Sequence, residues 1–233
     1  MPIKKTIFFL CFSLVIFAIY SEVNNDLTDE DLFSISNDYY LGINSSNYDK
    51  EYEKQIDDIK KIQKSVFLIA PKMKSIPKNA SREPADLAKV GSGYCHDRSR
   101  VIEKILRSYG YKTRHIAIYS KEKTKTFFKT LIAPKIDSHA ITEVLTKKGW
   151  LVIDSNSPWL SLDIDNNPIS IKQISDNKDQ VIKKLPNGFP SFIYELDFLY
   201  IYGLYSRHGK FFPPHNFFPD INYSEFLYNF YSK

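Results

Sequence analysis

The sequence GSGYCHD at residues 91–97 places a cysteine between a glycine-rich turn and the start of a predicted helix. The residues that follow carry an apolar stripe at helical spacing, typical of a helix that packs one face on a core: Val101, Ile102, Ile105, Leu106 and Tyr109. Cys95 is therefore expected at the N-terminus of this helix, where unpaired N–H groups and the helix dipole favour a thiolate and can bind an oxyanion. A cysteine in this place can also be a small packing residue, so the segment alone leaves both interpretations open.

The composition indicates an ordinary globular protein. The chain has 233 residues, of which 43% are apolar and 25% charged, enough for one domain with a substantial core. The formal net charge is +5, but the lysines are interspersed with acidic and apolar residues and form no recognisable nucleic-acid-binding module, so we expect no nucleic-acid partner. The histidines lack the close spacing of metal ligands, and we expect no metal and no other cofactor.

Residues 1–23 are predicted to be a signal anchor or a signal peptide. Lys4 and Lys5 precede an apolar run, and acidic residues follow it. This charge order predicts a membrane contact through residues 7–20, with the rest of the chain outside the cytoplasm, in a periplasmic or extracellular space. The best cleavage site ends at Ser21 and is poor, which favours an uncleaved anchor over a secreted protein. Cys11 lies within the apolar run, so the exported part has Cys95 as its only cysteine.

The next region, residues 24–82, is predicted to be a polar linker followed by a helix that starts near Asp49 and ends at Pro71. A short helix beginning at Pro84 then leads to the glycine turn before Cys95. After Gly110 the chain is predicted to form a strand over residues 114–119.

Residues 138–145 and 150–154 are predicted to form a β-hairpin around a turn that contains Gly149. With the loop centred between Lys147 and Lys148, residue numbers in cross-strand pairs sum to 295. His139 and Asp154 are then diagonal neighbours on one face, about 7–8 Å apart at the backbone, within reach of an imidazole and a carboxylate. A slip of one residue would place them on opposite faces.

These pieces together resemble the core of the transglutaminase-like superfamily. The resemblance covers about residues 83–160 and rests on ordered motifs: GYCHD at 93–97, YGYKTR at 109–114, HAITEV at 139–144, GW at 149–150 and the aspartate at 154. It implies an α+β fold with a papain-like core, in which a helix bearing the cysteine packs on an antiparallel sheet bearing a histidine and an aspartate. It also implies Cys95 as the nucleophile, His139 as the base and Asp154 as the group that orients the imidazole.

This trio suits acyl transfer through a thioester, because an imidazole can stabilise the thiolate and then protonate a leaving amine. The sequence departs from the family at Ile141, where an aromatic residue often stands, so the wall of the acyl pocket is expected to differ. No acidic cluster resembles the calcium sites of animal transglutaminases. His96 is expected to point away from the thiol, because neighbouring residues of a helix do not face one another.

The C-terminal extension, residues 161–233, is rich in aromatic residues, with 16 Phe and Tyr after residue 188. We expect it to pack on the core, although it could also line a substrate groove or face a membrane. Residues expected to contact substrate are Tyr94, Ile141, Trp159, Arg207 and His208.

The sequence thus predicts an exported cysteine enzyme that catalyses acyl transfer or amide hydrolysis on a protein, peptide or amine-bearing glycan. The alternative is a catalytically idle module of the same fold that binds a glycan or protein during assembly of the cell envelope.

Overall fold

The structure is a computed structural model that describes residues 2–39, 41–43, 50–74, 76, 82–126, 129–130, 136–205 and 220–231. Its elements in chain order are α1 (Pro2–Ser21), α2 (Asp29–Asp38), α3 (Tyr52–Ile69), α4 (Pro84–Val90), α5 (Cys95–Ser108), β1 (Thr113–Ser120), β2 (Ser138–Thr146), β3 (Gly149–Ile153), α7 (Ile171–Asp176), α8 (Lys178–Lys184), the 3-10 helix η1 (Phe192–Tyr194), β4 (Phe198–Tyr202), β5 (Leu204–Tyr205), β6 (Asp220–Ile221), α9 (Tyr223–Phe226) and α10 (Tyr228–Tyr231).

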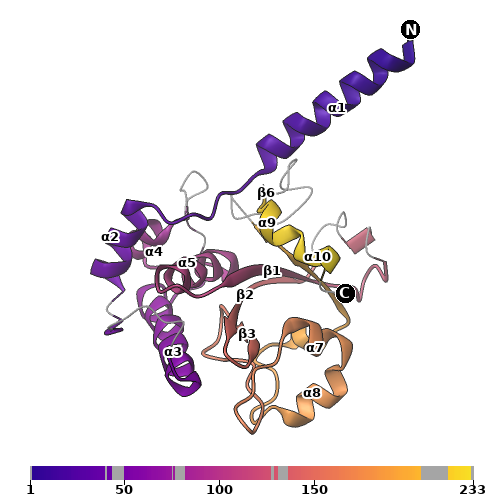
Figure 1. Cartoon of the computed structure of the whole chain (residues 1–233). Coiled ribbons are helices and arrows are strands. Elements are labelled where there is room, and N and C mark those ends of the chain that lie inside the picture. The colour runs from indigo at the N-terminus through magenta and orange to yellow at the C-terminus, as the bar shows by residue number, and fades with distance from the viewer. Residues whose placement is uncertain are drawn as a thin grey trace.

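The core is a four-stranded sheet in the order β3-β2-β1-β4, with each neighbouring pair antiparallel. α5 packs on β1 and β2 on one face of this sheet (Figure 1). Apolar side chains on the opposite face pack with α7, α8 and η1. Because it is covered on both faces, β1 is buried along its whole length. This arrangement, a cysteine-bearing helix on an antiparallel sheet, is the α+β fold that the sequence predicts.

The hairpin of β2 and β3 has the predicted register. Thr142 pairs with Ile153 and Thr146 with Gly149, so the paired numbers sum to 295. Between the strands lies a two-residue turn, after which Gly149 adopts a positive φ of 130°, a region that L-residues rarely occupy. The turn therefore fixes which side chains of β3 share a face with His139 of β2.

The N-terminal half contains one helix more than the sequence predicted. α3 forms and ends before Pro71 as expected, but α2 forms within the stretch that was expected to be a linker. Its first turn is closed by a capping box, in which the Asp31 backbone N–H donates to Thr28 Oγ1 at 3.1 Å and the Thr28 N–H donates to Asp31 Oδ2 at 2.9 Å. Tyr39 follows α2, is fully buried and donates to the Pro84 carbonyl at 2.8 Å. A few apolar residues in a polar stretch thus anchor it to the core.

The aromatic C-terminal region packs on the core, as predicted. β4 extends the sheet beside β1, and Tyr194, Phe198 and Tyr202 belong to the apolar cluster under the sheet.

α1 projects from the body of the protein (Figure 1) and leaves its apolar side chains exposed, Phe9 by 65%. Within the described parts of the chain, no helix combines the length and the apolar character that crossing a bilayer requires. The anchor expected at residues 7–20 therefore stays a prediction. The chain just after α1 is fastened to the C-terminal region: Ser21 Oγ lies 2.6 Å from the Tyr223 hydroxyl, and the Val23 N–H donates to the Ile221 carbonyl at 2.8 Å.

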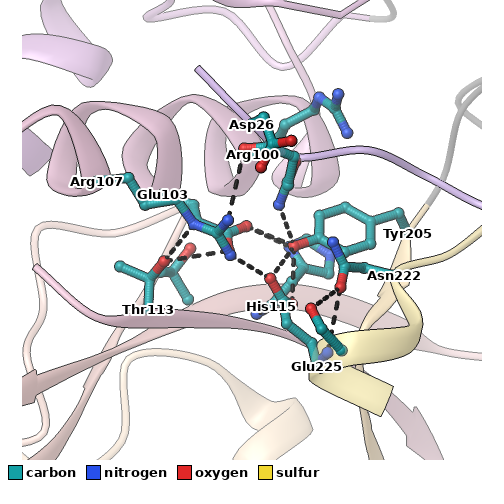
Figure 2. A network of polar contacts seen from close by, with 12 residues as sticks. Asp26, Arg100, Glu103, Arg107, Thr113, His115, Tyr205, Asn222 and Glu225 are labelled. Atoms are coloured by element: carbon teal, nitrogen blue, oxygen red, sulfur yellow. Dashed lines mark hydrogen bonds and ion pairs between the residues drawn. The ribbon is translucent and has the colours of Figure 1, made fainter. Parts of the chain in front are cut away.

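A buried polar network joins this C-terminal region to α5 and β1 (Figure 2). The Tyr205 hydroxyl lies 2.7 Å from Glu103 Oε2 and 2.8 Å from Glu225 Oε2, and Arg107 pairs with both carboxyl groups. The His115 ring stacks on Tyr205 at 4.1 Å between centroids, and the backbone N–H of His115 donates to Glu225 at 2.8 Å.

Burial raises the pKa of Glu225 well above its ordinary value, and the charge of Glu103 raises it further. Burial also acts to raise the pKa of Glu103, but Arg107 and His115 lower it overall. Glu225 is thus the protonated partner and Glu103 the ionised one.

This assignment predicts opposite costs for two matched substitutions. Glu103→Gln should lower the free energy of unfolding at pH 7 by about 3 kcal/mol, because Arg107 loses its buried counter-charge. Glu225→Gln should leave it unchanged or raise it, because glutamine resembles a neutral carboxyl group and removes the cost of keeping a proton on Glu225 at pH 7.

Urea unfolding of both variants measures the difference. Above the ordinary pKa of a glutamate, the unfolded chain releases the proton of Glu225, whereas the folded chain keeps it. This group therefore lowers the free energy of unfolding as the pH rises. The Glu225→Gln variant should therefore lose less stability than the unmodified protein as the pH rises from 5 to 8. A larger loss for Glu225→Gln than for Glu103→Gln would reverse the assignment.

Candidate active site

The turn between α4 and α5 requires both glycines that flank Ser92. Gly91 ends α4 in the left-handed conformation with φ of 64°. A Cβ on Gly93 would lie 2.6 Å from Leu87 Cδ1, closer than van der Waals contact allows. The close approach of α4 to the start of α5 therefore fixes the position of Cys95, the first residue of α5.

Asp97 holds the N-terminus of α5 in place. Its Oδ2 accepts a hydrogen bond from the Tyr94 backbone N–H at 2.9 Å, and its Oδ1 pairs with Arg82. The side chains of Arg82 and Asp97 are 1% and 0% exposed. This buried pair holds the first turn of the helix in place beneath the thiol.

His139 and Asp154 meet as the hairpin register predicts, with 2.7 Å between Nε2 and Oδ2. Asp154 Oδ1 accepts the backbone N–H groups of Asn156 and Ser157, each at 2.7 Å. The Tyr194 hydroxyl donates to Oδ2 at 2.7 Å. Four donors thus surround one fully buried carboxylate, whose orientation in turn fixes the His139 ring.

Cys95 is a free, partly exposed thiol that completes the trio. Burial acts to raise its pKa, but hydrogen bonds with His139 and His96 lower it to about 5. Burial acts to lower the pKa of His139, but hydrogen bonds with Asp154 and Cys95 raise it to about 10. Because Nε2 of His139 faces Asp154, its Nδ1 is left for the sulfur. These opposite shifts favour a thiolate–imidazolium pair at neutral pH.

Arg98 adds a buried cation beside this pair. Its guanidinium donates to the Ala70 carbonyl at 2.8 and 3.0 Å and to Asn156 Oδ1 at 3.3 Å. Burial lowers the pKa of Arg98, and the charges of Cys95 and Asp154 act in the opposite direction. Arg98 thus joins the end of α3, the start of α5 and the loop that carries Asp154.

The residues expected to contact substrate differ in their exposure to solvent. Tyr94 is 39% exposed at the start of α5, beside the thiol. Trp159 is partly buried, packs on Tyr194 at 5.5 Å between ring centroids and donates to the Gly188 carbonyl at 3.2 Å. Ile141 is fully buried in the apolar cluster under the sheet, because its position on β2 directs its side chain into the core. Contrary to expectation, it is therefore not accessible to a ligand. Arg207 and His208 lie outside the described residues.

A cleft of about 520 Å³ lies between α3 and the segment after β3. Gln63 on α3 forms part of its wall and donates to the carbonyls of Asp154, Ser157 and Trp159 at 2.7–3.0 Å. The loop that carries Asp154 therefore also forms the cleft. The other lining residues are Lys60, Lys64, Pro158, Trp159, Leu160, Leu162, Asp163, Asn166, Pro186 and Asn187.

Sequence reasoning missed two of these contacts. Tyr194 carries no motif and reaches Asp154 from 40 positions away, and Gln63 lies on a helix with no sign of a link to the site. For His96, which was expected to point away from the thiol, the structure places Nε2 3.4 Å from Asp97 Oδ1, and His96 also acts to lower the pKa of Cys95. No group of three or more His, Cys, Asp or Glu residues in the described segments could hold a metal ion.

The sequence model of the transglutaminase-like superfamily matches residues 45–155. The match includes the three candidate catalytic residues and begins before the expected residue 83, so it takes in α3. A comparison with curated proteins gave no match.

The geometry predicts the pH dependence of thiol reactivity. The alkylation rate of Cys95 should reach half its maximum near pH 5, well below the value of about 8.5 for a free thiol. Iodoacetamide labelling between pH 3 and 10, followed by mass spectrometry of the Cys95 peptide, measures it, with exposed Cys11 as the internal reference. A midpoint at or above 8.5 would exclude an activated nucleophile.

Proposed function

We propose, given that residues 45–155 belong to the transglutaminase-like superfamily, that this protein is a cysteine enzyme that transfers or hydrolyses acyl groups through a thioester on Cys95. The observation that carries the proposal is the pairing of His139 with Asp154 at 2.7 Å, together with the position of Cys95 at the start of α5 and the effect of His139 in lowering the pKa of the thiol. A thiolate beside a protonated imidazole combines the nucleophile and the proton donor that amide cleavage requires.

In the first half-reaction, the Cys95 thiolate attacks the carbonyl carbon of an amide, and the carbonyl oxygen becomes an oxyanion. The backbone N–H of Cys95, at the N-terminus of α5, supports this oxyanion. His139 then gives its proton to the nitrogen, the C–N bond breaks, and the amine leaves the thioester behind.

In the second half-reaction, neutral His139 takes a proton from water or from an acceptor amine as that group attacks the thioester. The C–S bond breaks, and the thiolate and imidazolium return. Asp154 stabilises the imidazolium and keeps Nε2 away from the sulfur, while Tyr194 holds the carboxylate in position.

The substrate class that we propose is a protein, a peptide or an amine-bearing glycan. The cleft beside the Asp154 loop supports an extended substrate, because it combines the Trp159 ring, prolines and polar groups with Lys60 and Lys64 on α3.

The enzyme is proposed to act outside the cytoplasm, held at a membrane through residues 7–20. The charge order around the apolar run supports export, and the exposed apolar side chains of α1 support a lipid environment for this helix.

Asp154→Asn should lower acyl transfer by about 10⁴-fold, because the amide stabilises neither the correct tautomer nor the imidazolium. The assay is intact-mass detection of an acyl adduct on Cys95 after incubation with a p-nitrophenyl ester, with release by hydroxylamine as the sign of a thioester. Asp165→Asn is the matched control, because Asp165 is an exposed turn residue beyond the hairpin, and it should keep full activity.

Rapid adduct formation by Asp154→Asn, together with loss in Asp165→Asn, would contradict the assigned roles. No adduct on the unmodified protein, with retained binding of a glycan or protein, would instead support the catalytically idle binding module.

The proposed location predicts the position of the C-terminus. A reporter that is active only in the cytoplasm should stay inactive when fused after Lys233, whereas one that requires export should be active. The opposite pattern would show that the catalytic domain remains inside.

A further inference from the structure

Two lysines on α3 line the cleft beside the Asp154 loop. Lys60 and Lys64 are both exposed and lie one helical turn apart, so their Cβ atoms are about 5–6 Å from one another. In the described part of the chain, neither ammonium group lies within ion-pair distance of a carboxylate, whereas that of Lys61, between them, lies 3.8 Å from Asp58. The two charges that face the cleft are therefore free to pair with a ligand.

The carboxylate in the cleft wall is already engaged by its own turn. Asp163 Oδ1 accepts the backbone N–H groups of Asp165 at 2.9 Å and Asn167 at 2.7 Å, and Oδ2 accepts the Asn167 side-chain amide at 3.2 Å. Burial acts to raise the pKa of Asp163, but these hydrogen bonds lower it overall. With two lysines and one aspartate, the lining of the cleft has a net charge of +1.

The wall that faces α3 suits the side chains of a peptide. Trp159 Nε1 donates to the Gly188 carbonyl at 3.2 Å, and Gln63 Nε2 donates to three backbone carbonyls at 2.7–3.0 Å, so these two donors are occupied. A glycan needs hydrogen bonds for hydroxyl groups along its whole length, whereas apolar side chains of a peptide need none. The apolar part of the lining consists of Pro158, Trp159, Leu160, Leu162 and Pro186.

One loop, residues 154–159, contacts both the cleft and the candidate catalytic residues. Asp154 at its start pairs with His139, and Trp159 at its end lines the cleft. Between them, Asn156 Oδ1 accepts a hydrogen bond at 3.3 Å from Arg98, which lies three positions after Cys95 on α5. A chain bound in the cleft therefore lies beside the loop that orients His139.

We propose that this cleft binds an acidic segment of a peptide substrate, in which carboxylates at alternate positions pair with Lys60 and Lys64. Alternate residues of an extended chain lie on one face, about 6–7 Å apart, close to the spacing of the two lysines. The residues between them then face the opposite wall at Trp159. This inference rests on the proposed function, because it names the substrate of the same site.

The test measures binding without chemistry, on the full-length Cys95→Ala variant. Fluorescence anisotropy compares a rhodamine-labelled peptide, Gly-Glu-Leu-Glu-Gly amide, with a counterpart in which lysines replace both glutamates. The glutamate peptide should bind about tenfold more tightly or better, because two attractive pairs become repulsive in the lysine peptide. Raising the salt concentration from about 20 to about 300 mM should weaken its binding about threefold or more, because exposed charges are screened.

Two double variants locate the binding. Lys60→Glu with Lys64→Glu should lower the affinity for the glutamate peptide about tenfold or more, and should raise the affinity for the lysine peptide. Lys54→Glu with Lys89→Glu is the matched control, because it changes the net charge equally at exposed lysines that do not line the cleft. Its affinity should stay within about twofold of the unmodified cleft, because distant exposed charges are screened.

Equal affinities for the two peptides, or equal losses in the two double variants, would overturn the proposal. Tighter binding of tetragalacturonic acid than of the glutamate peptide would assign the cleft to a carboxylate-bearing glycan and overturn it as well. The proposed function fails separately: selective binding of the glutamate peptide, with no acyl adduct on the unmodified protein, supports the ligand and contradicts the enzyme. An adduct without selective binding overturns the ligand alone.

Discussion

The geometry of the candidate site depends on one buried carboxylate. Asp154 stands at the point where β3 leaves the sheet, and its two oxygens accept hydrogen bonds from His139, Tyr194 and two backbone N–H groups. Its own carbonyl accepts from Gln63 on α3. A buried carboxylate is stable only when its desolvation is offset by such donors. The same contacts therefore stabilise the charge and connect α3, β2, η1 and the loop after β3 around the thiol.

The parts of the site that could be predicted from the sequence depend on short-range order. The glycine turn followed by an apolar stripe predicts where Cys95 lies on its helix, and a two-residue turn predicts the pairing that joins His139 to Asp154. Tyr194 could not be found in this way, because its contact with Asp154 depends on the path of the chain through α7 and α8, and no local pattern encodes that path. α2 was missed for a similar reason, since Tyr39 is buried by distant residues and not by its own helix.

The contacts of Ser21 and Val23 with Tyr223 and Ile221 join segments that lie far apart in the chain, with 202 positions between Ser21 and Tyr223. The segment that follows α1 therefore leaves the ribosome long before its partners do. Neither Glu225 nor the β6 strand can reach the network around Arg107 until that later segment has been made. The closure of this domain is therefore a late event in the life of a nascent chain, and α5 must wait for β6 and α9 before its buried polar groups are all paired.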